Sequence, residues 1–267
     1  MQTDPGGFVT LSIEDQNGIV TVRIDRPDAR NALDRQTIAE LTEVARQLRA
    51  RTDVRAVILG GGDRFFSCGV DLNASGDSGR LKLIERREAA RAGPDLCRAW
   101  EEIEAVTIAA IEGYCVGGAC ALALACDFRI LGKGAMMRLP EVAIGMNMSW
   151  QTLPRLARLA GASRAKRMVL FGEPVDAETA MSWSVADDVA PDGQALQVAA
   201  AWASKVAALP PIPVRMTKEA INRSIGALDA STSFMDRDQF LLASLSADFA
   251  EGVGAFLEKR TPRFEGD

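Results

Sequence analysis

The stretch GYCVGGACALALACD, residues 113–127, decides how the rest of this chain is interpreted. Two adjacent glycines, Gly117 and Gly118, stand before a run of alanine, leucine and cysteine that predicts a tightly packed helix. A helix beginning at Gly118 would direct unpaired N–H donors and a partial positive charge toward whatever lies at its N-terminus. Glycine also lets a ligand approach the backbone, because no Cβ stands in the way. The pattern predicts an anion site at this turn, although close helix packing alone also explains such glycines.

The residues around this stretch alternate between strand and helix signals. Apolar and polar residues alternate over 10–25 on both sides of Asn17-Gly18, which predicts a β-hairpin. A charged amphipathic helix is expected from about 81 to 104. Alternation of short apolar strands with helices predicts an α/β fold with a mixed or parallel sheet. The first helix is expected to bury Ile38, Leu41, Val44, Ala45 and Leu48, and the buried strands are expected within 55–62, 106–113 and 128–132.

The later part of the chain has a different pattern. From about residue 149 onward the strand signal disappears and helical segments follow one another, with a break at PPIP, residues 210–213. These helices would expose much alanine, leucine and methionine, so we expect them to associate with another copy of the chain. The expected organisation is a core over 1–200 and a helical oligomerisation region over 201–267.

Composition excludes several classes of function. The chain has 267 residues, a net charge of −5, five cysteines and no histidine. Without histidine or a CxxC pair we expect no metal site, and the usual base of serine or cysteine nucleophile triads is missing. The acidic balance argues against a nucleic-acid partner. No stretch approaches the roughly 18 apolar residues of a membrane span and MQTDPGGF is not a leader, so we expect a cytoplasmic protein.

Six motifs follow one another along the chain. They are RPDARNALD (26–34), FFSCGVDL (65–72), IEGYCVGGACALALACDFRI (111–130), RLPEVAIG (138–145), GASRAKRMVLFGEPVDAETA (161–180) and EGVGAFLEKRTPRF (251–264). Together and in this order they resemble the enoyl-CoA hydratase/isomerase family, also called the crotonase family, over nearly the whole chain. The resemblance implies a spiral of ββα units followed by a helical trimerisation region. It implies an acyl-CoA thioester as the partner, no cofactor beyond the coenzyme A (CoA) of that substrate, and a homotrimer or a dimer of trimers.

The resemblance also assigns roles to residues. It implies that the thioester oxygen lies between the peptide N–H groups of Val70 and Gly118, which would hold the negative charge of an enolate. It places Arg26 and Arg30 near the CoA phosphates, although a solvated surface charge remains the alternative for either arginine. The other residues expected to bind substrate or CoA are Ser67, Cys68, Asp71, Leu72, Gly117 and Trp150, together with Phe256 and Lys259 acting on a neighbouring subunit's CoA.

One catalytic carboxylate of the family pattern is missing. Family hydratases carry two glutamates 20 positions apart; here the first position is Ala121 and the second is Glu141. An alanine cannot orient or deprotonate water, and a general acid–base group is worth about 10²–10⁴-fold in rate. A single carboxylate can still move a proton from the α to the γ carbon, which makes double-bond isomerisation by Glu141 the leading interpretation. Glu141 as a helix cap or surface acid is the alternative, and the family pattern makes Asp71 and Glu112 scaffold acids.

Two rival functions stay open, and so does the acyl group. The first is a hydratase or related lyase in which Glu141 alone activates water. The second is a non-catalytic protein that binds acyl-CoA. Bulky residues in 146–150 stand where hydratases have a glycine-rich loop, so Trp150 is expected to form a wall of the acyl pocket; packing within the helical layer is the alternative.

Overall fold

Two β-sheets organise the chain, and the computed structural model describes residues 7–71 and 81–267. The strands of the described residues are β1 (Leu11–Gln16), β2 (Ile19–Ile24), β3 (Ala56–Gly60), β4 (Phe65–Ser67), β5 (Val106–Ile111), β6 (Tyr114–Val116), β7 (Phe128–Gly132), β8 (Met136–Arg138), β9 (Val175–Asp176) and β10 (Asp188–Ala190). One sheet has the order β1-β2-β3-β5-β7-β10 and the other has the order β4-β6-β8-β9.

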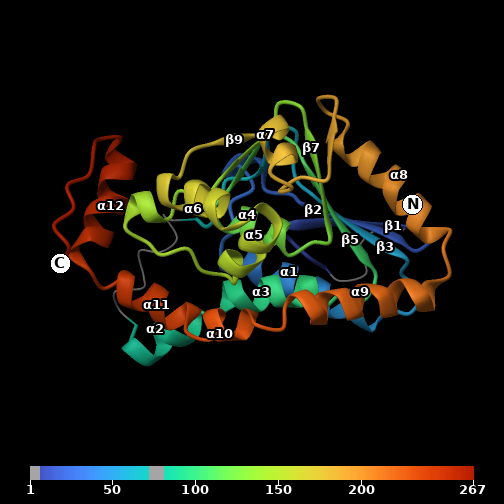
Figure 1. Cartoon of the computed structure of the whole chain (residues 1–267), viewed down its shortest axis with the longest axis horizontal. Coiled ribbons are helices and arrows are strands. Elements are labelled where there is room, and N and C mark those ends of the chain that lie inside the picture. The colour runs from blue at the N-terminus through green and yellow to red at the C-terminus, as the bar shows by residue number, and fades with distance from the viewer. Residues whose placement is uncertain (1–6, 72–80) are drawn as a thin grey trace.

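Helices surround these sheets (Figure 1). They are η1 (Pro27–Ala29), α1 (Arg35–Ala50), α2 (Leu83–Ala89), α3 (Ala92–Glu101), α4 (Gly118–Leu124), η3 (Val142–Ile144), α5 (Thr152–Ala160), α6 (Ala162–Phe171), α7 (Ala177–Ser182), α8 (Ala195–Ala207), α9 (Pro211–Ile225), α10 (Asp229–Ser233), α11 (Asp236–Ala243) and α12 (Ala247–Glu258). The chain runs β3 to β4, then β5 to β6, then β7 to β8, and thus passes from the first sheet to the second each time. Each pair is followed by helices, so the spiral of ββα units is confirmed.

The predicted hairpin is confirmed. Strands β1 and β2 pair antiparallel, with Leu11 opposite Ile24. Asn17 and Gly18 both have positive φ, 56° and 82°, as the two central residues of a type I′ hairpin turn require. The hairpin forms the edge of the larger sheet, in which β2, β3, β5, β7 and β10 run parallel.

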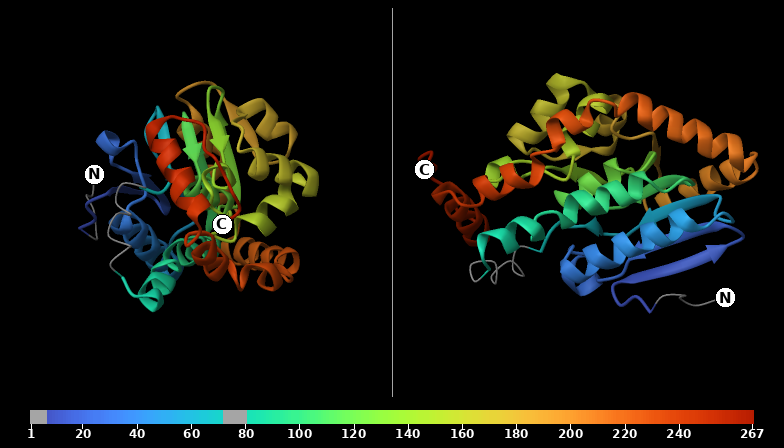
Figure 2. Two further views of the ribbon diagram at one scale, coloured as in Figure 1. Left: turned by 90° about the vertical axis from the view of Figure 1, so that its left-hand side faces the viewer. Right: turned by 90° about the horizontal axis from the view of Figure 1, so that it is seen from below.

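The parallel strands are buried on both faces. All residues of β3 and β5 are buried, so their sequences read as continuous apolar runs rather than alternating ones. One face packs against α8, through residues such as Ile58 and Ile108. The other packs against α1, α3 and α4, where Trp100 is fully buried and donates its ring N–H to the carbonyl of Leu41. Helices α1 and α3 lie side by side in Figure 2.

Some expected boundaries were wrong. The single helix expected over about 81–104 is two helices, α2 and α3, and Pro94 falls in the first turn of α3, where its missing N–H is tolerated. The expectation of no strand after about 149 was also wrong, since β9 pairs with β8 and β10 pairs with β7. With two and three residues, these strands are too short to show a pattern and form through tertiary pairing. The break expected at PPIP is confirmed, since α8 ends at Ala207 and α9 begins at Pro211; the last three residues of PPIP form the first turn of α9, where proline is tolerated as in α3.

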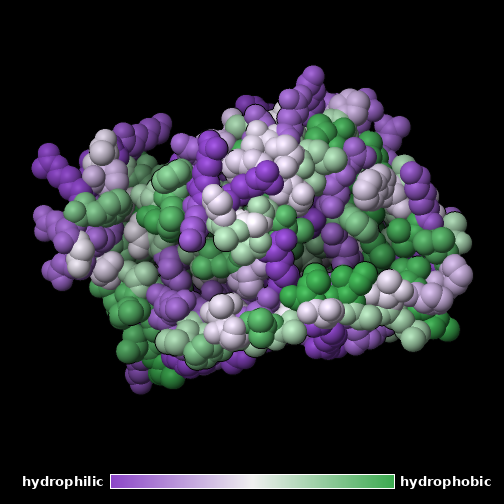
Figure 3. Space-filling model, viewed as in Figure 1, coloured by the Kyte–Doolittle hydropathy of each residue, from purple (hydrophilic) through white to green (hydrophobic). Residues whose placement is uncertain are grey.

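The last helices extend away from the sheets. Helices α9 to α11 follow one side of the molecule and α12 lies at its end (Figures 1 and 2). Apolar side chains gather over this side in Figure 3. In the described residues no single helix is long and apolar enough to cross a membrane, while one pair bent by 76°, Asp229–Ala243 and Ala247–Glu258, passes by length and composition. Helix α8 runs across the expected domain boundary at 200, which stays a prediction. The exposed apolar residues of these helices include Ile212, Met216, Ile221, Leu228, Phe234 and Leu242.

Candidate active site

The glycine turn before α4 has a conformation that only glycine adopts readily. Gly117 has φ 57° and ψ −123°, and it lies between β6 and α4. Its N–H donates to the carbonyl of Arg138 at 2.8 Å, and its own carbonyl accepts from the N–H of Ala121 at 3.1 Å. Within residues 7–71 and 81–267, no acceptor takes the N–H of Gly118, the first residue of α4. This N–H group therefore has no partner of its own among those residues, at a buried position at the start of α4.

The second expected donor, Val70, lies on a neighbouring loop. Leu33 forms a parallel bridge to Val70 by donating to the carbonyl of Gly69 at 2.8 Å and accepting from the N–H of Asp71 at 3.3 Å. In such a parallel bridge the N–H of Val70 itself points away from Leu33. A Cβ on Gly69 would lie 3.7 Å from the nitrogen of Gly118, so the two loops are adjacent. The structure thus brings the two predicted donor loops together.

Glu141 lies beside the same glycine turn. It follows β8 and immediately precedes η3, and a Cβ on Gly117 would lie 2.7 Å from Glu141 Oε1. The Oε2 atom is buried and has no hydrogen-bond partner among the described residues. Burial raises the pKa of Glu141 from 4.5 to about 7, and a hydrogen bond from its own backbone N–H acts in the opposite direction. The side chain makes no helix-cap hydrogen bond, so the alternative interpretation as a cap is wrong.

Ala121 and Trp150 occupy the other side of the turn. Ala121 is fully buried on α4 and lies three residues after Gly118, on the same helix face. The indole of Trp150 covers Gly118, since a Cβ there would be 2.8 Å from the ring atoms Cη2 and Cζ3. Trp150 is half-buried and also packs against the main core. The expected wall residue therefore lies next to one of the two expected N–H donors.

The two arginines expected near CoA have different partners. Arg26 donates to the carbonyl of Ala32 and forms an ion pair with Asp34 at 2.8 Å. Arg30 has a left-handed φ of 53°, and its guanidinium lies 5.7 Å from the ring centroid of Phe65. Arg26 is thus engaged by internal partners. The CoA role of both residues stays a prediction.

Ser67 and Cys68 shape the loop that carries Val70. Ser67 is buried and its hydroxyl accepts the N–H of Gly69 at 3.1 Å. The N–H of Cys68 donates to the carbonyl of Arg30 at 3.1 Å, and burial raises the pKa of its thiol. Their expected place near the adenine stays a prediction. Leu72 lies outside the described residues.

The remaining predicted residues lie on α12. Phe256 is half exposed, and Lys259 is exposed and ends the helix with a left-handed φ of 56°. The helix packs against η3, because a Cβ on Gly252 would collide with the backbone of Ile144. The role of Phe256 and Lys259 on a neighbouring subunit's CoA stays a prediction.

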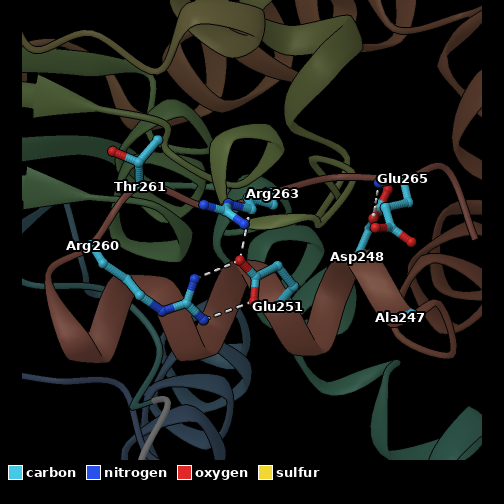
Figure 4. Close-up of a pocket in the computed structure, with 7 residues that line it drawn as sticks. All are labelled: Ala247, Asp248, Glu251, Arg260, Thr261, Arg263 and Glu265. Carbon is cyan, nitrogen blue, oxygen red and sulfur yellow. Dashed lines mark hydrogen bonds and ion pairs between the residues drawn. The ribbon is translucent and has the colours of Figure 1, made fainter.

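A separate hollow of about 600 Å³ lies between α12 and the C-terminal segment (Figure 4). Glu251 accepts from both terminal nitrogens of Arg260, at 2.6 and 2.7 Å, and these hydrogen bonds lower the pKa of Glu251 to about 2. Asp248 accepts the N–H of Glu265 at 2.8 Å. These partners tie the chain end to α12. The lining contains neither Glu141 nor the glycine turn, so the hollow is distinct from the candidate site.

Three residues near the site were missed from the sequence. Gly93 contacts the indole of Trp150, while Arg155 and Asp236 form hydrogen bonds with the backbone of residues 150–151. A glycine inside the amphipathic pattern of 81–104 was the available signal for the first. The other two look like ordinary surface charges in helical segments. Glu112 accepts the N–H of Ala195 at 2.8 Å, in agreement with the scaffold role expected for it.

Comparison with known proteins agrees with this geometry. The family model described as Enoyl-CoA hydratase/isomerase matches residues 14–267. The chain is 32% identical over 259 residues to 2,3-dehydroadipyl-CoA hydratase of Escherichia coli, covering 96% of this chain and 98% of that protein. An enoyl-CoA hydratase/isomerase structure from Pseudoalteromonas atlantica matches with a TM-score of 0.87 and 25% identity, covering 96% and 100% of the two chains. DspI of Pseudomonas aeruginosa matches with a TM-score of 0.78 and 34% identity, covering 98% and 100%.

Proposed function

Because the chain belongs to the enoyl-CoA hydratase/isomerase family, we propose that it shifts the double bond of an enoyl-CoA through a thioester enolate, with Glu141 as the only acid/base. The observation that supports this most directly is the buried, unpartnered Oε2 of Glu141 next to the glycine turn. The alanine at position 121 supports it as well, because no second carboxylate is available there to activate water.

One carboxyl group is enough for this reaction, because the proton that it removes from the substrate is returned to the substrate. Glu141 takes the proton from the α carbon of a 3-enoyl thioester, and the electrons of that C–H bond form the enolate. The N–H groups of Val70 and Gly118 hold the enolate oxygen, and removing one such donor typically costs about 10²–10³-fold in rate. The carboxylic acid then returns the proton to the γ carbon, which moves the double bond to the 2 position. A pKa of about 7 suits a group that must both accept and donate a proton near neutral pH.

Hydration is the second candidate, and the names of relatives favour it. The Escherichia coli relative is named as a hydratase, as is the (E)-benzylidenesuccinyl-CoA hydratase of Thauera aromatica at 31% identity. In this candidate Glu141 alone would activate the water that adds to C3. The alanine at position 121 argues against it, because that position offers no second carboxylate to orient the water.

Two incubations separate the candidates. With a 3-enoyl-CoA, an isomerase produces the conjugated 2-enoyl-CoA, detected by its ultraviolet absorbance and by mass spectrometry. With a 2-enoyl-CoA in heavy-oxygen water, a hydratase incorporates label at C3 and an isomerase does not. Label at C3 at a rate above that of isomerisation would overturn the proposal. If the chain binds both thioesters and neither reacts, a non-catalytic acyl-CoA-binding protein takes its place.

We also propose that the chain functions as a homotrimer or a dimer of trimers. The apolar residues exposed along α9 to α12 support this, since a surface of this kind is typical of a contact between subunits. Light scattering of the purified chain gives the mass of the assembly, and a monomer would overturn the proposal.

A further inference from the structure

The indole of Trp150 lies between two helices that each supply a glycine. Gly93 belongs to the first turn of α3 and Gly118 begins α4. A Cβ on Gly93 would overlap the indole atoms Cε2, Nε1 and Cδ2, and a Cβ on Gly118 would lie 2.8 Å from Cη2 and Cζ3. The ring thus fills the volume that a side chain at either position would need. The indole fits between the two helices only because both carry glycine where it packs.

The backbone that carries this indole has an unfavourable conformation. Trp150 and Gln151 have φ values of 63° and 57°, and each non-glycine residue in this region costs about 1–2 kcal/mol. Side chains from elsewhere hold it. The N–H of Gln151 donates to Asp236 Oδ2 at 2.9 Å, while Arg155 Nη1 donates to the carbonyls of Trp150 at 3.0 Å and Gln151 at 3.2 Å.

Both of these holding side chains are buried and fixed. Arg155 is 3% exposed and forms an ion pair with Glu101 of α3 at 2.7 Å. Asp236 is 8% exposed and comes from α11, in the helical region that follows the core. Burial raises the pKa of Asp236, while the N–H groups of Gln151 and Trp150 act in the opposite direction. The position of the indole therefore depends on a residue 86 positions away in the sequence.

We propose that Trp150 restricts the substrate to acyl groups without a branch at C3, and that Asp236 is the positioning residue that keeps the indole in place. The proposal rests on the proposed function for the site of the thioester. Gly117 contacts the carboxylate of Glu141 and Gly118 contacts the indole, so the two groups flank one dipeptide. In this proposal, a thioester oxygen that accepts the N–H of Gly118 would bring C2 and C3 near the indole, which lies against the same residue. A flat apolar ring accommodates a planar, unbranched chain and collides with a C3 methyl group.

Binding of two saturated thioesters tests the role of Trp150. Calorimetric titration should show that the wild type binds butyryl-CoA at least about tenfold more tightly than 3-methylbutyryl-CoA, because a methyl group against a fixed wall is worth about 10–200-fold. Trp150→Ala should bring the two dissociation constants within about threefold by tightening the branched ligand, and Trp150→Phe should lie between. The matched control is Trp183→Ala, since this half-buried indole instead lies 5.5 Å from the guanidinium of Arg167.

The role of Asp236 needs its own variants. Asp236→Leu should change the ratio of dissociation constants in the same direction as Trp150→Ala, without any contact with substrate. Asp236→Asn should keep the wild-type ratio, because its amide oxygen still accepts the N–H of Gln151. Asp238→Leu is the control on the same helix, where it breaks an ion pair with Arg87 and should leave the ratio unchanged.

The outcomes separate this inference from the proposed function. Saturated thioesters bind without reacting, so a failure to isomerise overturns the proposed function and leaves these ratios as they are. If Trp150→Ala and Trp150→Phe both keep the wild-type ratio of the two dissociation constants, the inference about Trp150 is overturned. If Asp236→Leu weakens the binding of both thioesters equally and leaves the ratio of their dissociation constants unchanged, the positioning role is overturned.

Discussion

Two turns flank the candidate site, and both place residues at positive φ, by different means. The turn before α4 uses a glycine at φ 57°, Gly117, and needs only backbone hydrogen bonds to its neighbours. The turn before α5 places Trp150 and Gln151 at φ 63° and 57°, where side chains are disfavoured. It is held by buried Arg155 and Asp236. The first turn needs only glycine and backbone partners, one of them in β8, whereas the second depends on the side chains of Arg155 and Asp236.

The difference matters for chemistry because each turn presents one group to the same place. The glycine turn presents backbone to the carboxylate of Glu141, since any side chain at Gly117 would collide with it. The second turn presents a large ring whose position is set from a distance. Changes at the first turn should therefore act on the rate of reaction, and changes at the second should act on which acyl groups bind.

The largest expected effect is on the group that the glycine turn accommodates. Glu141→Gln keeps the shape of the side chain and removes the base, so exchange of the α proton with heavy water should slow by about 10²–10⁴-fold. For the wild type, kcat/KM should rise with pH through a midpoint near 7, as the carboxylate forms. Both are measured by mass spectrometry of the recovered thioester.

Glu112→Gln is the control for this variant. Glu112 accepts the N–H of Ala195 and an amide oxygen can do the same, so its exchange rate should stay near that of the wild type. Equal exchange rates in the wild type and in Glu141→Gln would contradict a catalytic role for Glu141.

The second effect is a dependence of stability on pH that comes from the same carboxyl group. The folded pKa of about 7 lies above the unfolded value of 4.5, so the free energy of unfolding falls as pH rises from 4.5 to 7. This shift corresponds to about 3 kcal/mol. Because glutamine does not ionise, Glu141→Gln should gain about 3 kcal/mol relative to the wild type between pH 4 and pH 8, measured by urea unfolding. A difference that does not vary with pH would show that Glu141 is not buried in this way.

The third effect separates backbone strain from the contact with Glu141. Gly117→Ala adds a Cβ at φ 57° and ψ −123°, a sparsely populated region that costs about 1–3 kcal/mol, and pushes against Oε1 of Glu141. Gly161→Ala adds one at φ 78° with nothing within 4 Å. Both variants should lose similar stability on heating, and only Gly117→Ala should also lose about 10- to 100-fold in kcat/KM, the equivalent of 1.4–2.7 kcal/mol. Equal activity in the two variants would separate the glycine turn from catalysis.

The same contrast explains what sequence could predict. The hairpin, the buried strands and the first helix follow from local patterns, and the structure confirms all of them. The place of Gly117, Gly118 and Glu141 in one site could be predicted because the family motifs carry it, and these residues do lie together. In each case the information lies in short stretches of sequence, either a local pattern or a family motif.

The features that could not be predicted all depend on distant contacts. The two-residue strand β9 forms only because β8 offers it an edge. The sequence suggested Trp150 as a wall of the acyl pocket. It did not suggest that the indole packs against Gly93, or that Asp236 accepts a hydrogen bond from the backbone next to Trp150. A left-handed tryptophan has no local signature, because its stability comes from side chains that are close only after folding.

The smallest expected effect tests how the second turn is stabilised. Gln151→Gly relieves about 1–2 kcal/mol of backbone strain. It also loses a hydrogen bond of about 1 kcal/mol from Arg155 to the glutamine side chain, at 3.2 Å, and increases the freedom of the unfolded chain by about 0.5–1 kcal/mol. These opposing terms should leave the free energy of unfolding within about 1 kcal/mol of the wild type, measured by urea unfolding. The opposite substitution, Gly117→Ala, adds backbone strain at its turn, and no new contact there offsets the loss of stability. A Gln151→Gly variant that unfolds several kcal/mol more easily would mean that the glutamine side chain, rather than Arg155 and Asp236 acting on the backbone, holds the turn in place.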